Sequence, residues 1–209
     1  MQLRVAGRAR FPSEENSAQT IPLETTTWLA SADMESPRSR CPGCGAELAA
    51  GALPYRGYYH TSAECWSEYT HVLAVEYQDT ALFAQVHQLT VDAYAVQHAG
   101  GPHPDKSVAV HLVGLYLVLE RDFKSFDVPP RLQALASVVT KWPHFEVPKC
   151  RALLTAHDLA KAGSPREHAT RVREWAEQIW SMWSAHHPAI ASLAKNCFAI
   201  SEPHASNSL

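Results

Sequence analysis

The hydrophobic pattern is helical over most of the chain from residue 62 onward. In the first such segment Trp66, Tyr69, Val72, Leu73 and Tyr77 recur mostly at spacings of three or four residues, the period of one helix face. Comparable patterns predict further helices over residues 79–98, 105–121, about 130–141, 151–162, 164 to about 186, and a short one ending near 195. The prediction is a mainly α fold, a compact multi-helix bundle.

The two helices predicted at 79–98 and 105–121 form the centre of this pattern. Asp79 and Asp105 are the expected N-caps, and the Gly100-Gly101 pair ends the first helix. The second helix is apolar around nearly its whole circumference, which is typical of a buried helix. Gly114 within it predicts a close crossing with another helix.

Polar side chains interrupt the apolar surface of this helical pair. The candidates for chemistry are His87, Asp92, His98 and His111. His87 and His98 share one stripe and Asp92 faces elsewhere, so a shared site needs both helices to meet. One hypothesis is a second metal centre or a His/Asp acid–base pair. The alternative is a satisfied core network, in which Asp92, Tyr94 or the cysteine-rich segment pairs with His111.

A cysteine-rich segment, CPGCGAELAAGALPYRGYYHTSAECW, precedes the helices. Its pattern C-x2-C-x15-H-x4-C predicts a zinc knuckle, because zinc in structural sites takes four tetrahedral nitrogen or sulfur ligands. The expected zinc ligands are Cys41, Cys44, His60 and Cys65, with His71 as the alternative to His60. A redox CxxC is disfavoured, since no buried strand precedes it and a glycine follows it. An unligated pair of thiols also stays open.

The ends of the chain lack a sustained period. We expect a disordered leader over residues 1–40, the knuckle over 41–66, a helical domain over 67–198 and a frayed tail over 199–209. Met34 lies seven residues before Cys41, which raises the hypothesis that translation starts there.

Composition limits the classes of function. The net charge of −3 gives no electrostatic reason to expect nucleic acid or an anionic membrane as a partner. Five cysteines, two of them in CxxC, favour a metal site in a reducing compartment over a disulfide framework. No signal-peptide core is present, and the longest apolar run is shorter than the roughly 20 residues of a membrane span. We therefore expect a cytoplasmic protein without a membrane partner.

Several motifs taken together also suggest a relationship. CPGCG, ECW, VDAYAVQH, SVAVHLVGLYLVLE and REWAEQIWSMWSAHH resemble a bacterial family of uncharacterised proteins, a domain of unknown function, over about residues 41–190. The resemblance implies a common fold and carries no activity. It draws attention to the following residues: Cys41, Cys44, Cys65, Asp92, His98 and His111.

Three functions follow from these patterns. The first is a zinc-containing helical protein whose metal is structural and which binds a protein partner or a small ligand. The second is a hydrolase, metal-dependent or of the His/Asp acid–base type, with its site in the helical core. A zinc-ribbon nucleic-acid binder ranks last, because the knuckle has one arginine and one glutamate and no basic stripe.

Overall fold

The computed structural model describes residues 37–51 and 54–198. The β-strands are β1 (Arg38–Arg40) and β2 (Glu47–Ala49); the α-helices are α1 (Ala63–Gln78), α2 (Thr80–Gln97), α3 (Asp105–Leu119), α4 (Val128–Val138), α5 (Ala156–Leu159), α6 (Pro165–Met182) and α7 (His187–Phe198). Two short 3₁₀ helices, Ser125–Asp127 and Ser184–His186, precede α4 and α7. The predicted mainly α fold with a knuckle at its N-terminal side is confirmed.

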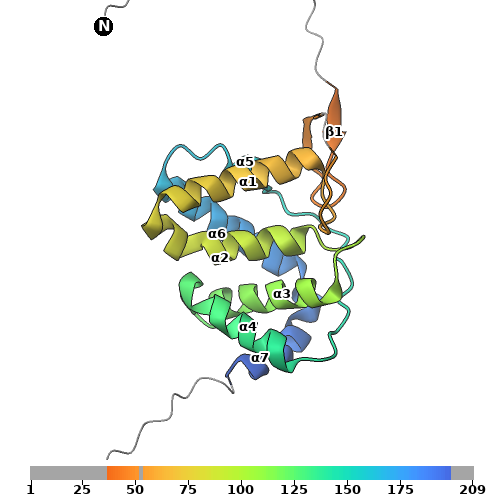
Figure 1. Cartoon of the computed structure of the whole chain (residues 1–209), viewed down its shortest axis with the longest axis vertical. Helices are drawn as coiled ribbons and strands as arrows, with labels where there is room; N and C mark the ends of the chain where they lie inside the picture. Colours follow the sequence, from red (N-terminus) through yellow and green to blue (C-terminus); the bar gives the residue numbers. More distant parts are fainter. Residues whose placement is uncertain (1–36, 52–53, 199–209) are drawn as a thin grey trace, which may run out of the picture. The chain divides into compact units, whose positions relative to one another are not determined.

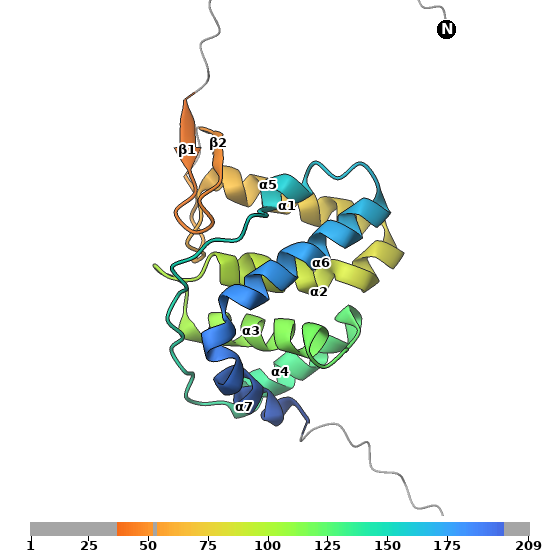
Figure 2. The same cartoon turned by 180° about the vertical axis from the view of Figure 1, so that it is seen from behind.

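Helix α2 is the central element. It packs against α1, α3 and α6, while α4 and α7 pack on the far side of α3 (Figures 1 and 2). Of its 18 residues, ten are buried, including the whole run from Asp92 to Gln97. The predicted burial of the next helix also holds, since Leu112, Val113, Gly114 and Leu115 are buried in α3.

The helix ends follow the local capping chemistry that the sequence indicates, with one exception. The Asp79 carboxylate accepts from the backbone N–H groups of Ala81 and Leu82, and the Ser164 hydroxyl accepts from that of Glu167. Asp105, predicted as an N-cap, instead lies in the first turn of α3, where its charge still favours the positive end of the helix dipole.

The predicted helix over residues 151–162 is wrong for most of its length, because only Ala156–Leu159 is helical. The backbone N–H groups of Leu153 and Leu154 both donate to the side-chain oxygen of Gln178 on α6, which holds the chain extended there. A capping box between Thr155 and Asp158 then starts the short helix α5.

The predicted leader is also too long at its C-terminal end. Arg38–Arg40 form β1, which pairs antiparallel with Glu47–Ala49 in a hairpin above the knuckle turn. Residues 1–36, with the proposed start at Met34, and the predicted tail at 199–209 lie outside the described residues.

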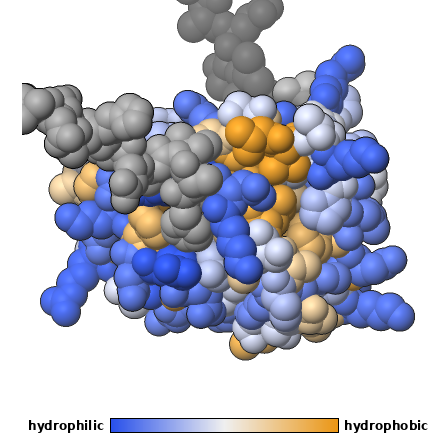
Figure 3. Space-filling model, turned by 90° about the horizontal axis from the view of Figure 1, so that it is seen from below, coloured by the Kyte–Doolittle hydropathy of each residue, from blue (hydrophilic) through white to orange (hydrophobic). Residues whose placement is uncertain are grey.

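Tryptophans on α6 provide much of the core, as their spacing predicts. Trp175, Trp180 and Trp183 are all buried, and the indole N–H groups of the first two donate to Gln97 and Glu120. The face seen from below carries an apolar patch surrounded by hydrophilic side chains (Figure 3). Within the described part of the chain, no helix has the length and apolar character to cross a membrane.

Candidate metal centre

Four buried side chains meet between the knuckle and the adjoining ends of α1 and α2. The ligand atoms of Cys41, Cys44, Cys65 and His98 all lie within 4.8 Å of one another. The Cys44 and Cys65 sulfurs are 3.7 Å apart, and the Cys65 sulfur is 3.3 Å from Nε2 of His98. Zinc–sulfur bonds of about 2.3 Å and zinc–nitrogen bonds of about 2.0 Å give tetrahedral edges of roughly 3.8 and 3.5 Å. The residues therefore fit a single tetrahedral ion.

The knuckle turn is held by its backbone. The Cys41 N–H donates to the carbonyl of Ala46 at 2.9 Å, and the Gly45 N–H donates to the carbonyl of Cys41 at 2.9 Å. Gly45 has a φ of 81°, a conformation that favours glycine. It allows the Ala46 N–H to point at the Cys44 sulfur, 3.5 Å away.

Gly43 allows the close approach of the turn to α2. A Cβ atom at this position would lie 2.3 Å from the carbonyl oxygen of His60 and 2.6 Å from Cδ2 of His98. Those distances are far inside van der Waals contact, so only glycine lets the CPGCG turn reach the histidine.

Cys65 and His98 come from helix ends that the sequence defines. Ser62 caps α1 by accepting from the Cys65 N–H at 3.2 Å, which fixes the cysteine in the first turn. At the end of α2, Nδ1 of His98 donates to the carbonyl of Tyr94 at 2.8 Å. This bond leaves Nε2 as the ligand atom, the arrangement usual for metal-bound histidines.

Two hydroxyl groups lie next to the thiols. The Thr61 and Tyr94 hydroxyls are 2.9 Å apart. Thr61 Oγ1 lies 3.6 Å from the Cys41 sulfur, and the Tyr94 hydroxyl lies 3.9 Å from the Cys65 sulfur. Tyr69 stacks on the Tyr94 ring at 3.8 Å between centroids. These side chains shield the thiols from water, and the two hydroxyl groups can donate weak hydrogen bonds to thiolate sulfurs.

The three thiols shift one another's pKa values. Hydrogen bonds from Cys44 and Cys65 lower the pKa of the Cys41 thiol. The contact with Cys41 raises the pKa of Cys44 to about 12, and it raises the pKa of Cys65 above its ordinary range. These opposite shifts show that the three thiols interact strongly with one another. A bound cation would favour the thiolate form of all three.

The histidines suggested by local spacing are not in this cluster. His60 is half-buried and contributes only its backbone N–H, which donates to the carbonyl of His98 at 3.0 Å. His71 is exposed on α1. In the structure the histidine beside the three cysteines is His98, 33 residues beyond Cys65, and not His60 or His71.

The four candidates for catalysis do not form one site. His98 joins the cysteines, whereas Nδ1 of His111 bonds to the Asp92 carboxylate at 2.8 Å. The same Asp92 oxygen accepts from Gln88. The other oxygen has no partner among the described residues and faces Gly114, which confirms the predicted close crossing. Burial raises the pKa of Asp92, although His111 opposes the shift.

His87 belongs to a third network around a buried acid that sequence reasoning missed. Both Glu76 oxygens accept, one from Nδ1 of His87 at 2.8 Å and the other from Nε2 of His168 at 3.0 Å and the hydroxyl of Thr90. Burial works against the charge, but these three donors hold the pKa of Glu76 below its ordinary range. Glu76 follows Leu73 by three residues and Val72 by four, so it falls on the apolar stripe of α1. That position in the sequence could have indicated a buried acid.

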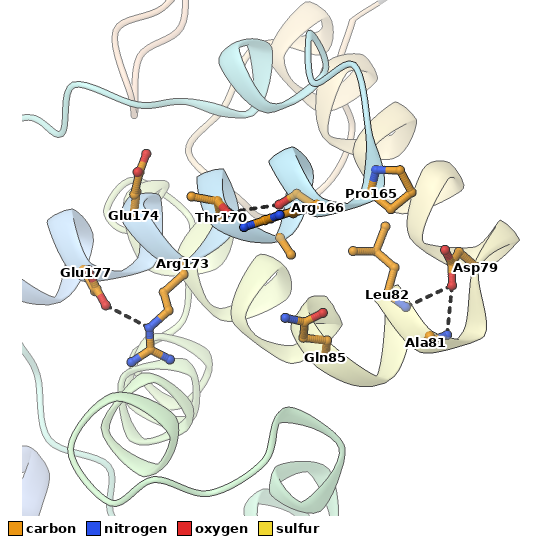
Figure 4. Close-up of a pocket in the computed structure, with 11 residues that line it drawn as sticks. Asp79, Ala81, Leu82, Gln85, Pro165, Arg166, Thr170, Arg173, Glu174 and Glu177 are labelled. Atoms are coloured by element: carbon orange, nitrogen blue, oxygen red, sulfur yellow. Dashed lines mark hydrogen bonds and ion pairs between the residues drawn. The ribbon is translucent and has the colours of Figure 1, made fainter.

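The groove in Figure 4 contains none of these residues. It is a hollow of about 640 Å³ between α2 and α6, where Arg173 pairs with Glu177 and the Asp79 carboxylate caps α2. Its lining contains no histidine and no cysteine. Among the described residues, Cys41, Cys44, Cys65 and His98 are the one group with metal-binding geometry.

Comparison with known proteins identifies the family but assigns no activity. No curated protein and no solved structure matches the chain. A family model described as a family of unknown function, DUF5946, matches residues 39–184, which contain the knuckle and helices α1 to α6. The chain therefore belongs to the DUF5946 family.

Proposed function

We propose that this protein is a zinc protein whose metal is structural and whose role is to bind a protein partner or a small ligand. The observation that carries the proposal is a set of four buried side chains, Cys41, Cys44, Cys65 and His98, whose possible ligand atoms all lie within 4.8 Å of one another. Three sulfurs and one nitrogen favour zinc over magnesium or calcium, which take oxygen ligands.

The coordination set supports a structural role for the metal. Four protein ligands leave no position for water or substrate, so the ion contributes free energy of folding and no Lewis acidity. It joins the knuckle, the start of α1 and the end of α2, three segments that share few other polar links. The thiol ligands must stay reduced, which agrees with a cytoplasmic location. The net charge of −3 supports no role in nucleic-acid binding.

Metal analysis tests the proposal directly. We expect one zinc per chain in untagged protein purified under reducing conditions, and less than a tenth of that in Cys41→Ser. Cys150→Ser is the matched control, because Cys150 is exposed and outside the cluster. Protein that carries no zinc, or an equal loss in both variants, would contradict the proposal.

The hydrolase alternative now depends on the Asp92–His111 pair alone. Its 2.8 Å contact orients the imidazole as a buried carboxylate does in an acid–base dyad. The hollow between α2 and α6 is lined by neither residue of this pair, so it gives the hydrolase no support. A hydrolytic activity lost in His111→Gln, with zinc content and folding unchanged, would favour the enzyme.

A further inference from the structure

A second hollow, of about 260 Å³, adjoins the metal centre. Its walls are the knuckle turn with His60, the end of α2 with the Gly100-Gly101 turn, the extended segment 147–152, and the end of α6. The segment between α4 and α5 passes the knuckle on its way to α5 (Figure 2). The site is thus assembled from parts of the chain far apart in sequence.

The charge of this hollow is opposite to that of the whole chain. Its lining contains Lys149, Arg151 and His60 and no aspartate or glutamate, whereas the chain carries a net charge of −3. Within the described part of the chain, neither the ammonium group of Lys149 nor the guanidinium group of Arg151 forms a hydrogen bond or an ion pair. Two charged donors therefore remain available to a ligand.

Arg151 is placed against the knuckle. A Cβ atom on Gly45 would lie 1.6 Å from a terminal nitrogen of its guanidinium group, so the side chain crosses the glycine face of the turn. The planar fork of an arginine matches the two oxygens of a carboxylate or phosphate.

Trp183 is buried in the same wall. Its side chain is 1% exposed, and its indole N–H has no partner among the described residues. Trp175 and Trp180 on the same helix both donate to side-chain oxygens. This nitrogen is not accessible to solvent, so Trp183 forms part of the wall and offers no donor to a ligand in the hollow.

The charge of the proposed zinc centre is too small to neutralise both Lys149 and Arg151. A zinc ion with three thiolates and one imidazole carries one negative charge, and the C-terminal end of α2 adds about half a charge. The two charges of Lys149 and Arg151 together exceed that amount. The carbonyl of His98 at this helix end already accepts from the His60 backbone and from His103.

We propose that this hollow binds a small molecule through a carboxylate or phosphate group, held by Lys149 and Arg151. Its volume is just below the range of about 300–1,000 Å³ for drug-sized ligands, so the ligand is a small metabolite-like anion. The inference rests on the proposed function, because the zinc holds the knuckle that forms one wall.

Calorimetric titration of the zinc-loaded full chain tests the proposal. The probes are inorganic phosphate and, separately, citrate, in a buffer free of both, with zinc content measured on every sample. We expect saturable one-to-one binding of one of them, weakened at least tenfold in Lys149→Gln/Arg151→Gln. The matched control, Lys161→Gln/Arg166→Gln, removes two exposed cations elsewhere and changes the affinity less than twofold.

The reactivity of Cys150 tests independently where the anion binds. It lines the same hollow and is the exposed member of the five cysteines. The bound anion slows alkylation of Cys150 by neutral iodoacetamide at least threefold in the unmodified sequence. In the Lys149→Gln/Arg151→Gln variant, the same anion concentration leaves the rate unchanged.

The outcomes separate the two proposals. No saturable binding of either anion, equal weakening in both double variants, or an alkylation rate insensitive to bound anion overturns the anion site. Loss of zinc from Lys149→Gln/Arg151→Gln without anion binding in the parent protein also overturns it, and assigns the cations to the metal centre. Anion binding by protein that carries no zinc contradicts the structural-zinc proposal alone.

Discussion

The two ends of the α1–α2 hairpin bury polar groups in different ways. Cys65 faces His98 at one end, and Glu76 faces His87 at the other. Cys65 and Glu76 are eleven residues apart on α1, and His87 and His98 are eleven residues apart along α2. Eleven residues span about three turns and roughly 16 Å, so both pairs lie on the same seam. Protein donors satisfy the carboxylate at one end. The other end brings three cysteines and one histidine into a group that could hold a metal ion.

Removing the fourth ligand produces the largest expected effect. His98→Ala should lower zinc affinity more than a hundredfold and the free energy of unfolding by about 3 kcal/mol or more, because structural zinc binds with roughly 10–16 kcal/mol. His60→Ala is the control and should keep full zinc content, since that residue contributes its backbone. Competition with a chromophoric chelator measures both. Zinc loss in His60→Ala and retention in His98→Ala would reverse the ligand assignment.

Neutralising the acid at the other end should leave the metal in place. Glu76→Gln replaces a carboxylate, which accepts from two histidines and Thr90, by an amide. The NH2 group of the amide is a donor and would face these same donors. We expect a loss of about 3–5 kcal/mol in urea unfolding, with one zinc per chain retained. Glu174→Gln on exposed α6 surface should change stability by less than about 0.5 kcal/mol. Parallel loss of zinc in Glu76→Gln would mean that the two ends are not independent.

The Asp92 network between α2 and α3 provides an intermediate case. A methyl group on Gly114 would lie 2.0 Å from the unpartnered Asp92 oxygen. Gly114→Ala should therefore destabilise the protein by about 1–3 kcal/mol, despite the better helix propensity of alanine. Thermal unfolding measures it, and Gly163→Ala, in an exposed turn with room for the methyl, is the control. A stabilised Gly114→Ala variant would show that this crossing is loose.

The smallest effect is a pH dependence specific to the carboxylate end. Because the pKa of Glu76 is lowered in the folded protein, its contribution to stability is present above the unfolded value of about 4.3. That contribution disappears as the pH falls through the lower folded pKa. The stability difference between the parent protein and Glu76→Gln should thus shrink as the pH falls below about 4. Urea titrations of both at each pH test this, and a constant difference throughout would contradict it.

The sequence predicts the local part of this architecture well. Ser62, Asp79 and Ser164 define helix starts through bonds to residues two or three positions away, and the CPGCG spacing brings two thiols into one turn. Three of the four residues in the metal centre were therefore accessible as neighbours in sequence.

The fourth residue depends on tertiary structure. His98 reaches Cys65 because α1 and α2 have nearly equal lengths, 16 and 18 residues, and reverse direction at Asp79. Linear spacing favoured His60, which is nearer in sequence but supports the site only through its backbone. Glu76 was missed for the same reason, since His168 comes from α6, 92 residues away. The matching eleven-residue intervals on α1 and α2 would have indicated both pairs.

The position of His98 has a consequence for the order of folding during synthesis. All three thiols leave the ribosome before the imidazole, and 33 residues separate the last of them from it. If the site binds zinc as proposed, an ion captured early by the three cysteines would keep an open position until α2 is complete and has folded back along α1. During this interval the nascent chain would be exposed to metal exchange and thiol oxidation. Binding by His98 would end it, and the helical hairpin would then be joined by a turn at one end and by the metal at the other.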